Sequence, residues 1–419
     1  MGRIVAGLRI AWRNLWRNGR RTGITAAAIA LNTAVLIVSF GLMHGIVVDM
    51  VRQITTISVG DAQVHAQGFR AARSFYKAIP PAALDALLAQ ATTAGVLAAP
   101  RSFGFGLVSS GPKSAGAMFW GVDPVAERRA FGLPGRIARG QFLADRVEGR
   151  SYLGRPVREI VLGRKLAKTL HAEVGSELVA VVQAGDGSLG NELFTVTGVL
   201  AGVGEEIDRA GALVHRQDFD ELFVAQGRVH ELALSSRGAL PAEEVAARLG
   251  PISAGLELQT WGELLPAIAD MVRMFDGVMW LFALVFLLAA GLGVTNTMLM
   301  ATYERMREFG VLKALGASPW RILGGVTGEA LLLGMLASLA GSCLGLAGTW
   351  YLTRVGIDLS GGGDLVVQGM AMQSVWRASL TPADVILPVL AMWLACVLAA
   401  LYPAAKAARI DPVRAMTHV

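Results

Sequence analysis

Two short stretches of the sequence have residue types and spacings close to those of nucleotide-binding or catalytic motifs. Residues 106–114 (GLVSSGPKS) nearly match the phosphate-binding loop pattern G-x-x-x-x-G-K-[ST], but Pro112 moves Lys113 one position along and removes a backbone N–H from the loop. Residues 186–190 (DGSLG) approach the nucleophile pattern G-x-S-x-G around Ser188, with aspartate in place of the first glycine. Neither pattern is complete, so we predict a turn at the first stretch and a hairpin tip at the second.

Candidate metal ligands are few. Glu205, Glu206 and Asp208 form a short acidic cluster, but their spacing matches no regular cation-binding loop, and we predict a solvated loop instead. The six histidines are scattered and include no H-E-x-x-H motif. Both cysteines, Cys343 and Cys396, fall in apolar stretches and are expected to pack there rather than form a disulfide. We therefore predict no catalytic residue, no metal site and no enzyme active site in this chain.

The sequence as a whole is strongly apolar. Hydrophobic residues make up 53% of the 419 residues, charged residues make up 17%, and the mean hydropathy is +0.50, which is too apolar for a water-soluble chain of this length. A helix needs about 18 or more apolar residues to cross roughly 30 Å of hydrocarbon. Four stretches reach that length: 23–48, 277–301, 322–352 and 385–402. The first is too long for a cleaved secretory signal and is expected to remain as an anchor.

The distribution of positive charge gives an expected orientation. Residues 1–22 carry a net charge of +6, and residues 303–321 and 403–419 carry +2 each, whereas the whole chain carries +6, so the remaining residues carry −4. Because lysine and arginine beside a membrane span stay on the cytoplasmic side, both termini and the segment 302–321 are expected in the cytoplasm. The high pI of about 9.6 then comes from the positive residues expected beside membrane lipid at the inner face, and it does not indicate binding of nucleic acid.

The resulting fold class is an α-helical membrane protein with four transmembrane helices and a large α+β extracytoplasmic domain between helices 1 and 2. This domain covers residues 49–276, which is long enough to bury its own core, and a shorter outer connection covers 353–384. Asp186 and Gly187 mark a hairpin turn between two strands of the domain. Strands are expected at 58–67, at 229–236 and in the hairpin 177–200, and helices at 81–91, 158–170 and 241–249.

Polar and small residues inside the apolar stretches are expected to serve contacts between helices. Glu329 lies near the cytoplasmic end of the third stretch, where a carboxylate is costly in hydrocarbon but can reach water or an arginine. Asn32, His44 and Asn296 are expected to form hydrogen bonds between helices rather than bind substrate. Small residues follow one stripe of the third stretch and should allow close helix contact within the chain or with a second copy: Gly334, Ser338, Gly341, Gly345 and Gly348.

Residues 303–322 (YERMREFGVLKALGASPWRI) predict a helix, a break and a new helix. Gly316 is placed to end the first helix, Ser318 to cap the next one and Pro319 to open it. A short exposed helix buries little surface by itself, so its apolar side chains need lipid headgroups or a soluble partner to cover them. These side chains are Phe309, Val311, Leu312 and Leu315. Residues 1–22 place apolar residues on one helical face and arginines on the other, which predicts a helix lying in the membrane interface.

Three segments resemble the FtsX/MacB-type ABC transporter permeases, a family that includes the lipoprotein-releasing LolC and LolE permeases. They are residues 11–22 (AWRNLWRNGRRT), 296–318 (NTMLMATYERMREFGVLKALGAS) and 402–416 (YPAAKAARIDPVRAM). The order of one span, a large outer domain and three further spans is also similar to that of the family. The resemblance therefore covers the whole chain, with its most specific parts in the cytoplasmic motifs.

The resemblance implies a complex in which two such subunits pair, as a homodimer or with a paralogue, and dock a dimer of cytoplasmic ABC ATPases. ATP and Mg would bind in those partner chains, since no intact phosphate loop is present here. Closure of the ATPases would move the outer domains through the first two spans. Residues 304–318 match the family's ATPase-coupling segment, and the residues carried over from it are Glu304, Arg305, Arg307, Glu308, Phe309, Gly310, Val311, Leu312, Lys313, Leu315 and Gly316.

The implied function is that of a multi-pass permease of the bacterial inner membrane, with its large domain in the periplasm, that extracts or moves lipoproteins or other amphiphiles. The outer domain is larger than that of the cell-division member FtsX, and the fused nucleotide-binding domain of MacB has no counterpart here, so the layout resembles LolC and LolE. Two alternatives stay open. One is export of drugs or peptides with a periplasmic partner, and the other is transmission of a signal to a cell-wall hydrolase.

Overall fold

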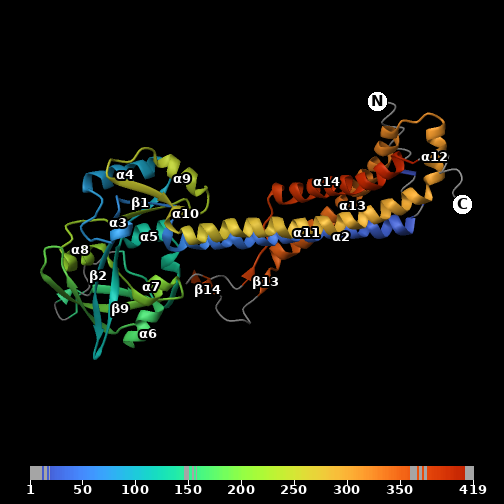
Figure 1. The fold of residues 1–419 in the computed structure, drawn as a ribbon. Coiled ribbons are helices and arrows are strands. Elements are labelled where there is room, and N and C mark those ends of the chain that lie inside the picture. Colours follow the sequence, from blue (N-terminus) through green and yellow to red (C-terminus); the bar gives the residue numbers. More distant parts are fainter. Residues whose placement is uncertain are drawn as a thin grey trace. The chain divides into compact units, whose positions relative to one another are not determined.

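The computed structural model describes residues 12–13, 17, 19–145, 151–152, 155–156, 158–358, 366–367, 370–371 and 375–410. The chain divides into two compact units, and Figure 1 shows the elements of each. The helical unit comprises residues 1–48, 271–361 and 375–419, and the sheet unit comprises residues 49–270 and 362–374. The interfacial helix expected at residues 1–22 lies largely outside the described residues.

Four long apolar helices make up most of the helical unit. They are α2 (Gly19–Ile54), α11 (Pro266–Glu304), α13 (Pro319–Arg354) and α14 (Pro382–Ala408), and the short α12 (Met306–Ala314) lies between α11 and α13 in the chain. The most apolar part of each helix has a mean hydropathy of 2.0 to 2.4, and each helix is long enough to cross about 30 Å of hydrocarbon. Each helix contains the apolar stretch that predicted it, so the four candidate spans are present.

Glycines on α13 allow its close contact with α2. A Cβ placed on Gly341 would lie 2.4 Å from the carbonyl oxygen of Ala30, and a Cβ placed on Gly345 would lie 2.9 Å from the Cβ of Ile37. Gly348 also faces α2. These distances leave no room for a side chain, so this part of the small-residue stripe serves contact within the chain and lets two helix backbones approach each other.

The same stripe also meets α14. A Cβ on Gly334 would lie 3.0 Å from the Sγ atom of Cys396, which is buried. The hydroxyl of Ser338 accepts a hydrogen bond of 2.7 Å from the indole N–H of Trp393. As a result, α13 packs against both α2 and α14. The apolar core among these helices and α11 includes Ile29, Leu36, Ala283, Val294, Leu333 and Met392.

We expect Gly341→Leu and Gly345→Leu each to lower the thermal stability of the purified chain. Overpacking a close contact of this kind costs about 1–3 kcal/mol. Gly324→Leu is the matched control, because Gly324 lies on the same helix and has no atom within 4 Å of the added Cβ. Thermal unfolding in detergent compares the three variants. Unchanged melting of both the Gly341 and the Gly345 variants would show that the α2–α13 contact does not stabilise the unit.

A mixed ten-stranded β-sheet forms the centre of the sheet unit. Its main path runs β12-β1-β11-β2-β3-β10-β7-β9-β4, and β8 pairs with both β2 and β9. The β3–β10 and β7–β9 pairs are parallel, and the other pairs are antiparallel. The strands are β1 (Ala62–Ala66), β2 (Leu97–Ser110), β3 (Lys113–Val122), β4 (Ile137–Gly140), β7 (Arg158–Leu162), β8 (Glu177–Gln183), β9 (Leu189–Leu200), β10 (Gly211–His215), β11 (Glu231–Ser235) and β12 (Leu256–Thr260).

Short helices connect these strands and complete the core. Phe219 and Phe223 of α8 stack at 4.4 Å between ring centroids, and Phe223 meets Phe119 of β3 edge-on at 5.6 Å. The helices are η1 (Thr55–Val59), α3 (Phe69–Ala72), α4 (Pro81–Thr93), α5 (Pro124–Ala130), η2 (Leu133–Gly135), α6 (Arg164–Leu170), α7 (Glu205–Ala210), α8 (Arg216–Phe223), α9 (Ala242–Leu249) and α10 (Trp261–Leu264). Two-residue strands are β5 (Ser151–Tyr152), β6 (Arg155–Pro156), β13 (Ile357–Asp358), β14 (Val366–Val367), β15 (Met370–Ala371) and β16 (Val375–Trp376).

Most local predictions for the sheet unit are confirmed, and two are partly wrong. The strand expected from residue 58 begins only at Ala62, because Ser58 and Val59 belong to η1. β1, β11, α4 and α9 lie where the sequence predicts strands and helices, and β8 and β9 form the predicted hairpin over 177–200. The helix predicted over 158–170 exists only from Arg164, because residues 158–162 form β7 between β10 and β9. Apolar spacing in so short a run fits a strand buried on both faces as well as a helix, and pairing with two neighbours decided the outcome.

Candidate functional site

The segment between α11 and α13 forms the helix, break and new helix that its sequence predicts. α12 ends at Ala314, and Gly316 follows with a φ of +87°, the left-handed conformation that favours glycine. Ser318 then occupies the N-cap position with an extended backbone, although its hydroxyl makes no capping hydrogen bond, and Pro319 is the first residue of α13. α12 is therefore a separate short helix rather than a continuation of α11 or α13.

One face of α12 is packed within the helical unit. Phe309 is buried and packs against Ile322 of α13 and against alanines of α14. Gly310 is buried beside it, and Nζ of Lys313 donates a hydrogen bond of 2.9 Å to the carbonyl oxygen of Ile410. The expectation that Phe309 needs lipid or a soluble partner to cover it is therefore wrong. The side chains of α13 and α14 already cover it.

The other apolar side chains of this segment are exposed. Val311, Leu312 and Leu315 are 44%, 46% and 80% exposed. Trp320, near the start of α13, is 78% exposed, and Arg307 is exposed as well. A helix of nine residues is not stable by itself, so α12 depends on its buried face for its position. It presents an apolar surface next to a basic side chain, and an apolar helix face of this kind can bind in an apolar groove.

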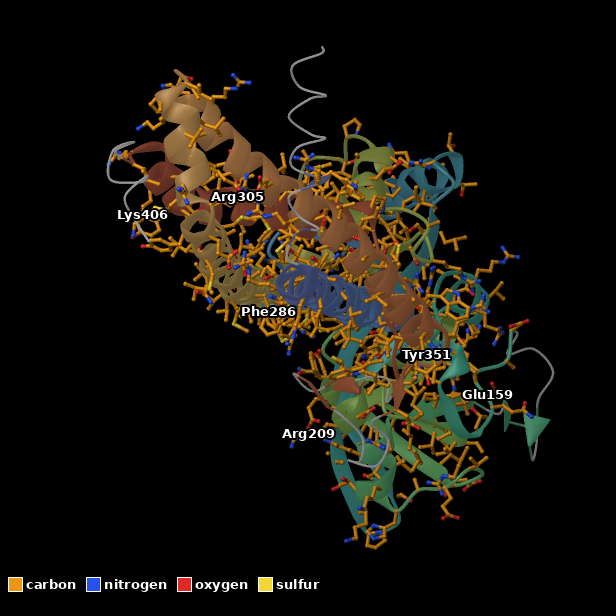
Figure 2. All side chains as sticks on the ribbon, turned by 90° about the vertical axis from the view of Figure 1, so that its right-hand side faces the viewer. Glu159, Arg209, Phe286, Arg305, Tyr351 and Lys406 are labelled. Carbon is orange, nitrogen blue, oxygen red and sulfur yellow. The ribbon has the colours of Figure 1, made fainter. Side chains whose placement is uncertain are left out.

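Four charged side chains connect α12 to α13 and to the residues just before α2. Nη1 of Arg305 donates to both carboxylate oxygens of Glu329 on α13, at 2.8 and 2.9 Å. Nε of the same arginine lies 3.2 Å from Oε2 of Glu308 on α12, and Nη1 of Arg17 lies 2.6 Å from Oε1 of Glu308. We call the series Glu329, Arg305, Glu308 and Arg17 the ion-pair chain. Figure 2 labels Arg305, which lies between the end of α11 and the start of α12.

The ion-pair chain accounts for a carboxylate inside the apolar helix α13. The side chains of Glu329 and Arg305 are 10% and 16% exposed, so the pair is largely removed from water. The expectation that Glu329 reaches an arginine is confirmed. Partial burial by itself would raise the pKa of Glu308, but hydrogen bonds from Arg17 and Arg305 outweigh it and lower that pKa, so Glu308 is ionised at neutral pH.

A second ion pair lies beside the ion-pair chain. Nη1 of Arg21 on α2 donates to Oε1 of Glu304 at the end of α11, at 2.9 Å. The hydroxyls of Thr25 and Thr297, on the same two helices, are 2.7 Å apart. These groups border a small polar pocket whose lining includes three arginines and two glutamates, so positive and negative side chains pair there between helices. It is lined by Arg17, Arg21, Thr22, Thr297, Met298, Ala301, Glu304, Arg305, Glu329 and Leu333.

Sequence reasoning missed these links between segments. Arg17 and Glu308 are 291 positions apart, so no i,i+4 spacing reveals their pairing. Lys406 of α14 bonds to the hydroxyl of Tyr303 at the end of α11, and these two residues are 103 positions apart. The available signal was the presence of two acidic residues, Glu304 and Glu308, in a segment that also contains three arginines and one lysine.

Three other polar residues of the apolar helices contribute less than the sequence predicts. In the part of the chain that the structure describes, no side-chain hydrogen bond joins Asn32 or Asn296 to another helix. Nδ1 of His44 lies 4.0 Å from Oδ2 of Asp384 at the start of α14. Thr25 with Thr297, and Trp393 with Ser338, form hydrogen bonds between helices instead.

The two incomplete catalytic motifs both form the predicted turns. Gly111 and Pro112 are the two-residue turn between β2 and β3, whereas a phosphate-binding loop would join a strand to a helix. Ser188 lies in the turn between β8 and β9, where its N–H and its Oγ donate to Oδ1 of Asp186 at 2.9 and 2.6 Å. The hydroxyl is thus engaged in the turn itself.

The acidic cluster forms a helix, so the prediction of a solvated loop is wrong. Glu205, Glu206 and Asp208 lie in the first turn of α7, where the helix dipole favours negative charge. Glu205 pairs with Lys165, and buried Asp208 accepts a hydrogen bond of 3.0 Å from the N–H of Val203. Among the described residues there is no group of three or more side chains placed to hold a metal ion.

Two family models match the chain. The MacB-like periplasmic core domain matches residues 22–252, which is more than half of the chain, and the FtsX-like permease C-terminal model matches residues 280–412. The chain belongs to the FtsX/MacB family of ABC permeases. The resemblance stated from the sequence is thereby confirmed, and α12 with its exposed apolar side chains lies within the part matched by the FtsX-like model.

Two members of this family illustrate the similarity of the chain to known permeases. LolC of Neisseria meningitidis serogroup B, a lipoprotein-releasing system transmembrane protein, is 23% identical over 77% of this chain and 79% of its own length. PvdT of Pseudomonas entomophila, a pyoverdine export ATP-binding/permease protein, is 26% identical over 99% of this chain. The chain spans 60% of the length of PvdT.

Solved structures give a weaker likeness. The periplasmic region of MacB from Actinobacillus actinomycetemcomitans is 13% identical, with a TM-score of 0.34, over 54% of this chain and 98% of the solved one. The assignment to the family therefore rests on the two family models.

Proposed function

We propose that this chain is the permease subunit of a mechanotransmission-type ABC transporter. A separate cytoplasmic ATPase binds α12, hydrolyses ATP with its own Mg, and moves the sheet unit through α2 and α11. The observation that carries the proposal is the exposed apolar side chains of α12 on a helix that Phe309 and the ion-pair chain hold in place. An apolar helix surface presented in this way fits a groove on a soluble partner.

The proposed orientation places α12 and both termini in the cytoplasm and the sheet unit in the periplasm. The net charge of +6 over residues 1–22 supports it, because arginine-rich segments stay on the inner side. With Cys343 and Cys396 replaced, an impermeant thiol reagent should label Ser188→Cys from outside the inner membrane and leave Glu308→Cys unlabelled. The opposite labelling pattern would reverse the orientation.

The proposed cargo is a lipoprotein or another amphiphile taken from the inner membrane, and the similarity to LolC supports this choice. Export of a small secreted molecule is the second candidate, supported by the similarity to PvdT over nearly the whole chain. Control of a cell-wall hydrolase, the remaining alternative from the sequence analysis, is the third. The three candidates differ in what the sheet unit contacts in the periplasm.

Purification of the tagged chain from its own host tests this proposal. A mild detergent should retain a second permease subunit and an ATPase dimer, and mass spectrometry should identify both together with any cargo. A bound lipoprotein would support the first candidate, a periplasmic adaptor the second and a hydrolase the third. Isolation of the chain without any ATPase, under conditions that preserve lipid contacts, would count against the permease proposal.

A further inference from the structure

The end of α2 and the start of α11 connect to β1 and β12, which are neighbouring strands of the sheet. α2 continues through the π-helix η1 into β1, and β12 leads through α10 into α11. β1 and β12 are antiparallel partners with Ala62 opposite Thr260, and the N–H of Trp261 donates to the carbonyl oxygen of Asp61 at 3.0 Å. The end of one helix and the start of the other are therefore attached at the same edge of the sheet.

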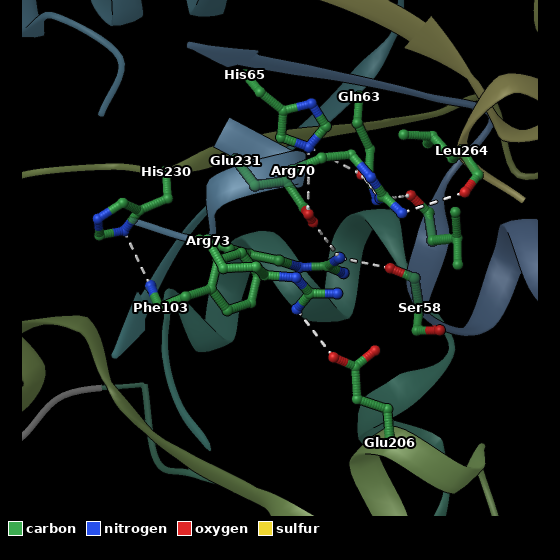
Figure 3. Close-up of polar contacts among 12 residues, drawn as sticks. Ser58, Gln63, His65, Arg70, Arg73, Phe103, Glu206, His230, Glu231 and Leu264 are labelled. Carbon is green, nitrogen blue, oxygen red and sulfur yellow. Dashed lines mark hydrogen bonds and ion pairs between the residues drawn. The ribbon is translucent and has the colours of Figure 1, made fainter. Parts of the chain in front are cut away.

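Side chains from β1 and α3 hold the backbone of both ends (Figure 3). Nε2 of Gln63 on β1 donates to the carbonyl oxygen of Val59 in η1 at 2.7 Å. Nη2 of Arg70 on α3 donates to the carbonyl oxygen of Leu264 in α10 at 3.1 Å, and its Nη1 lies 3.5 Å from Oε1 of Gln63. These two side chains thus connect η1 to α10 without relying on the strand pairing.

A buried ion triad extends these contacts toward the centre of the sheet. The guanidinium of Arg101 on β2 is fully buried and pairs with Glu127 of α5 at 2.6 Å and with Glu231 of β11 at 2.9 Å. Its Nη1 also donates to the carbonyl oxygen of Ser58 in η1. Oε2 of Glu231 lies 3.6 Å from Nε2 of His65 on β1. Two neighbouring carbonyl groups of η1 are therefore held by side chains from two different strands.

Stability alone does not account for this arrangement. Ionised groups lose hydration when buried, and well-packed apolar residues in their place are often equally or more stabilising. These side chains also bind carbonyl groups of η1, which is a π-helix, a rare element that frequently occurs at functional sites. Nε2 of His65 lies 3.0 Å from Oε1 of Gln63 and so connects the ion triad to the Gln63–Arg70 contact. Directional bonds of this kind hold backbone segments at a set position, which apolar packing does less strictly.

We propose that these side chains form a joint that fixes the end of α2 and the start of α11 to each other, with Gln63 and Arg70 as positioning residues. The joint consists of Gln63, His65, Arg70, Arg101, Glu127 and Glu231. A displacement at η1 reaches α10 through the joint, so the two helices act on β1 and β12 together. The physical link stands by itself, whereas its use in transport rests on the proposed function.

Hydrogen exchange of the full chain in lipid nanodiscs, with no ATPase present, tests the joint. Arg70→Ala removes the bond to Leu264 and the contact with Gln63, and we expect amides in both 55–61 and 260–268 to exchange about tenfold faster. Arg73→Ala is the matched control. Arg73 caps the same helix α3 but pairs with Glu206 of α7, so both stretches should keep their exchange rates.

Faster exchange of 260–268 alone, with 55–61 unchanged, would overturn the joint, because α10 would then open independently of η1. Gln63→Leu provides a second test that leaves the Arg70 bond to Leu264 available. It should still accelerate exchange in 260–268, and full protection there would also overturn the joint. Both results are independent of ATPase copurification, whose failure would bear on the proposed function and not on this link.

Discussion

Replacing both Leu312 and Leu315 with aspartate is expected to abolish binding of the partner ATPase while the permease stays folded. Burial of each leucine in a groove stabilises the complex by about 1.5–3 kcal/mol, and each aspartate would have to lose its hydration there. Because 1.4 kcal/mol changes Kd tenfold, we expect affinity to fall by at least about a hundredfold. The two leucines are 46% and 80% exposed, so the isolated chain should tolerate the change.

Copurification of the ATPase with the tagged permease, and ATP hydrolysis by the complex, measure this effect. Leu189 and Leu193 of the sheet unit are a matched pair, because they are 76% and 45% exposed. The double variant Leu189→Asp/Leu193→Asp should bind the ATPase normally. Unchanged affinity in the Leu312/Leu315 variant would show that α12 is not the docking surface. Failure of that variant to insert into the membrane would show that the segment packs within its own helices.

Breaking the pair between Arg305 and Glu329 is expected to have the largest effect on stability. Glu329→Leu leaves the largely buried Arg305 with its contact to Glu308 but without the carboxylate that accepts two of its hydrogen bonds, and removing one partner of a buried pair costs up to about 3–5 kcal/mol. Arg305→Leu should be similarly destabilising. The double variant Arg305→Leu/Glu329→Leu contains neither charge, so its stability should return close to that of the unsubstituted chain.

Thermal unfolding measures the stability of these variants, and ATP hydrolysis by the assembled transporter measures whether α12 still transmits its coupling to the ATPase. We expect the double variant to regain its melting temperature but not its coupled ATP hydrolysis, because α12 then keeps the packing of Phe309 against α13 but loses the ion pair that fixes its position. Glu244→Leu, which breaks an exposed pair with Arg248, is the control and should change melting little. Full coupling in the double variant would show that the ion-pair chain does not position α12. Unchanged melting of both single variants would contradict the stabilising role.

Several features of the helical unit could be predicted because each depends on residues close together in the sequence. An apolar run of sufficient length satisfies its backbone hydrogen bonds only as a helix in hydrocarbon, so α11 and α14 follow from composition. The break after α12 follows from Gly316, which adopts a positive φ, and from Pro319, which suits the first turn of a helix. In the sheet unit, the hairpin turn at Gly187 could be predicted for the same reason.

The error over residues 158–170 has a different origin. Residues 158–162 present apolar side chains at a spacing that a buried strand and a helix share. They form β7 because β10 and β9 supply hydrogen bonds on both sides, and the residues that pair with β7 lie 36 or more positions away in the sequence. Arg164, by contrast, follows Gly163 and starts α6 where the sequence already favoured a helix.

The sequence alone determined four apolar helices, the concentration of positive charge at one side of them, and a separate short helix ending near Gly316. These depend on the composition of single segments, and a segment reports its own hydropathy, charge and turn preferences directly. Only the tertiary structure decided that Phe309 is buried while Leu315 is exposed to solvent, and that Arg17 forms an ion pair with Glu308. A helix surface contains no information about which distant side chain will lie against it. Packing selects those partners by shape and by the cost of leaving a buried charge unpaired.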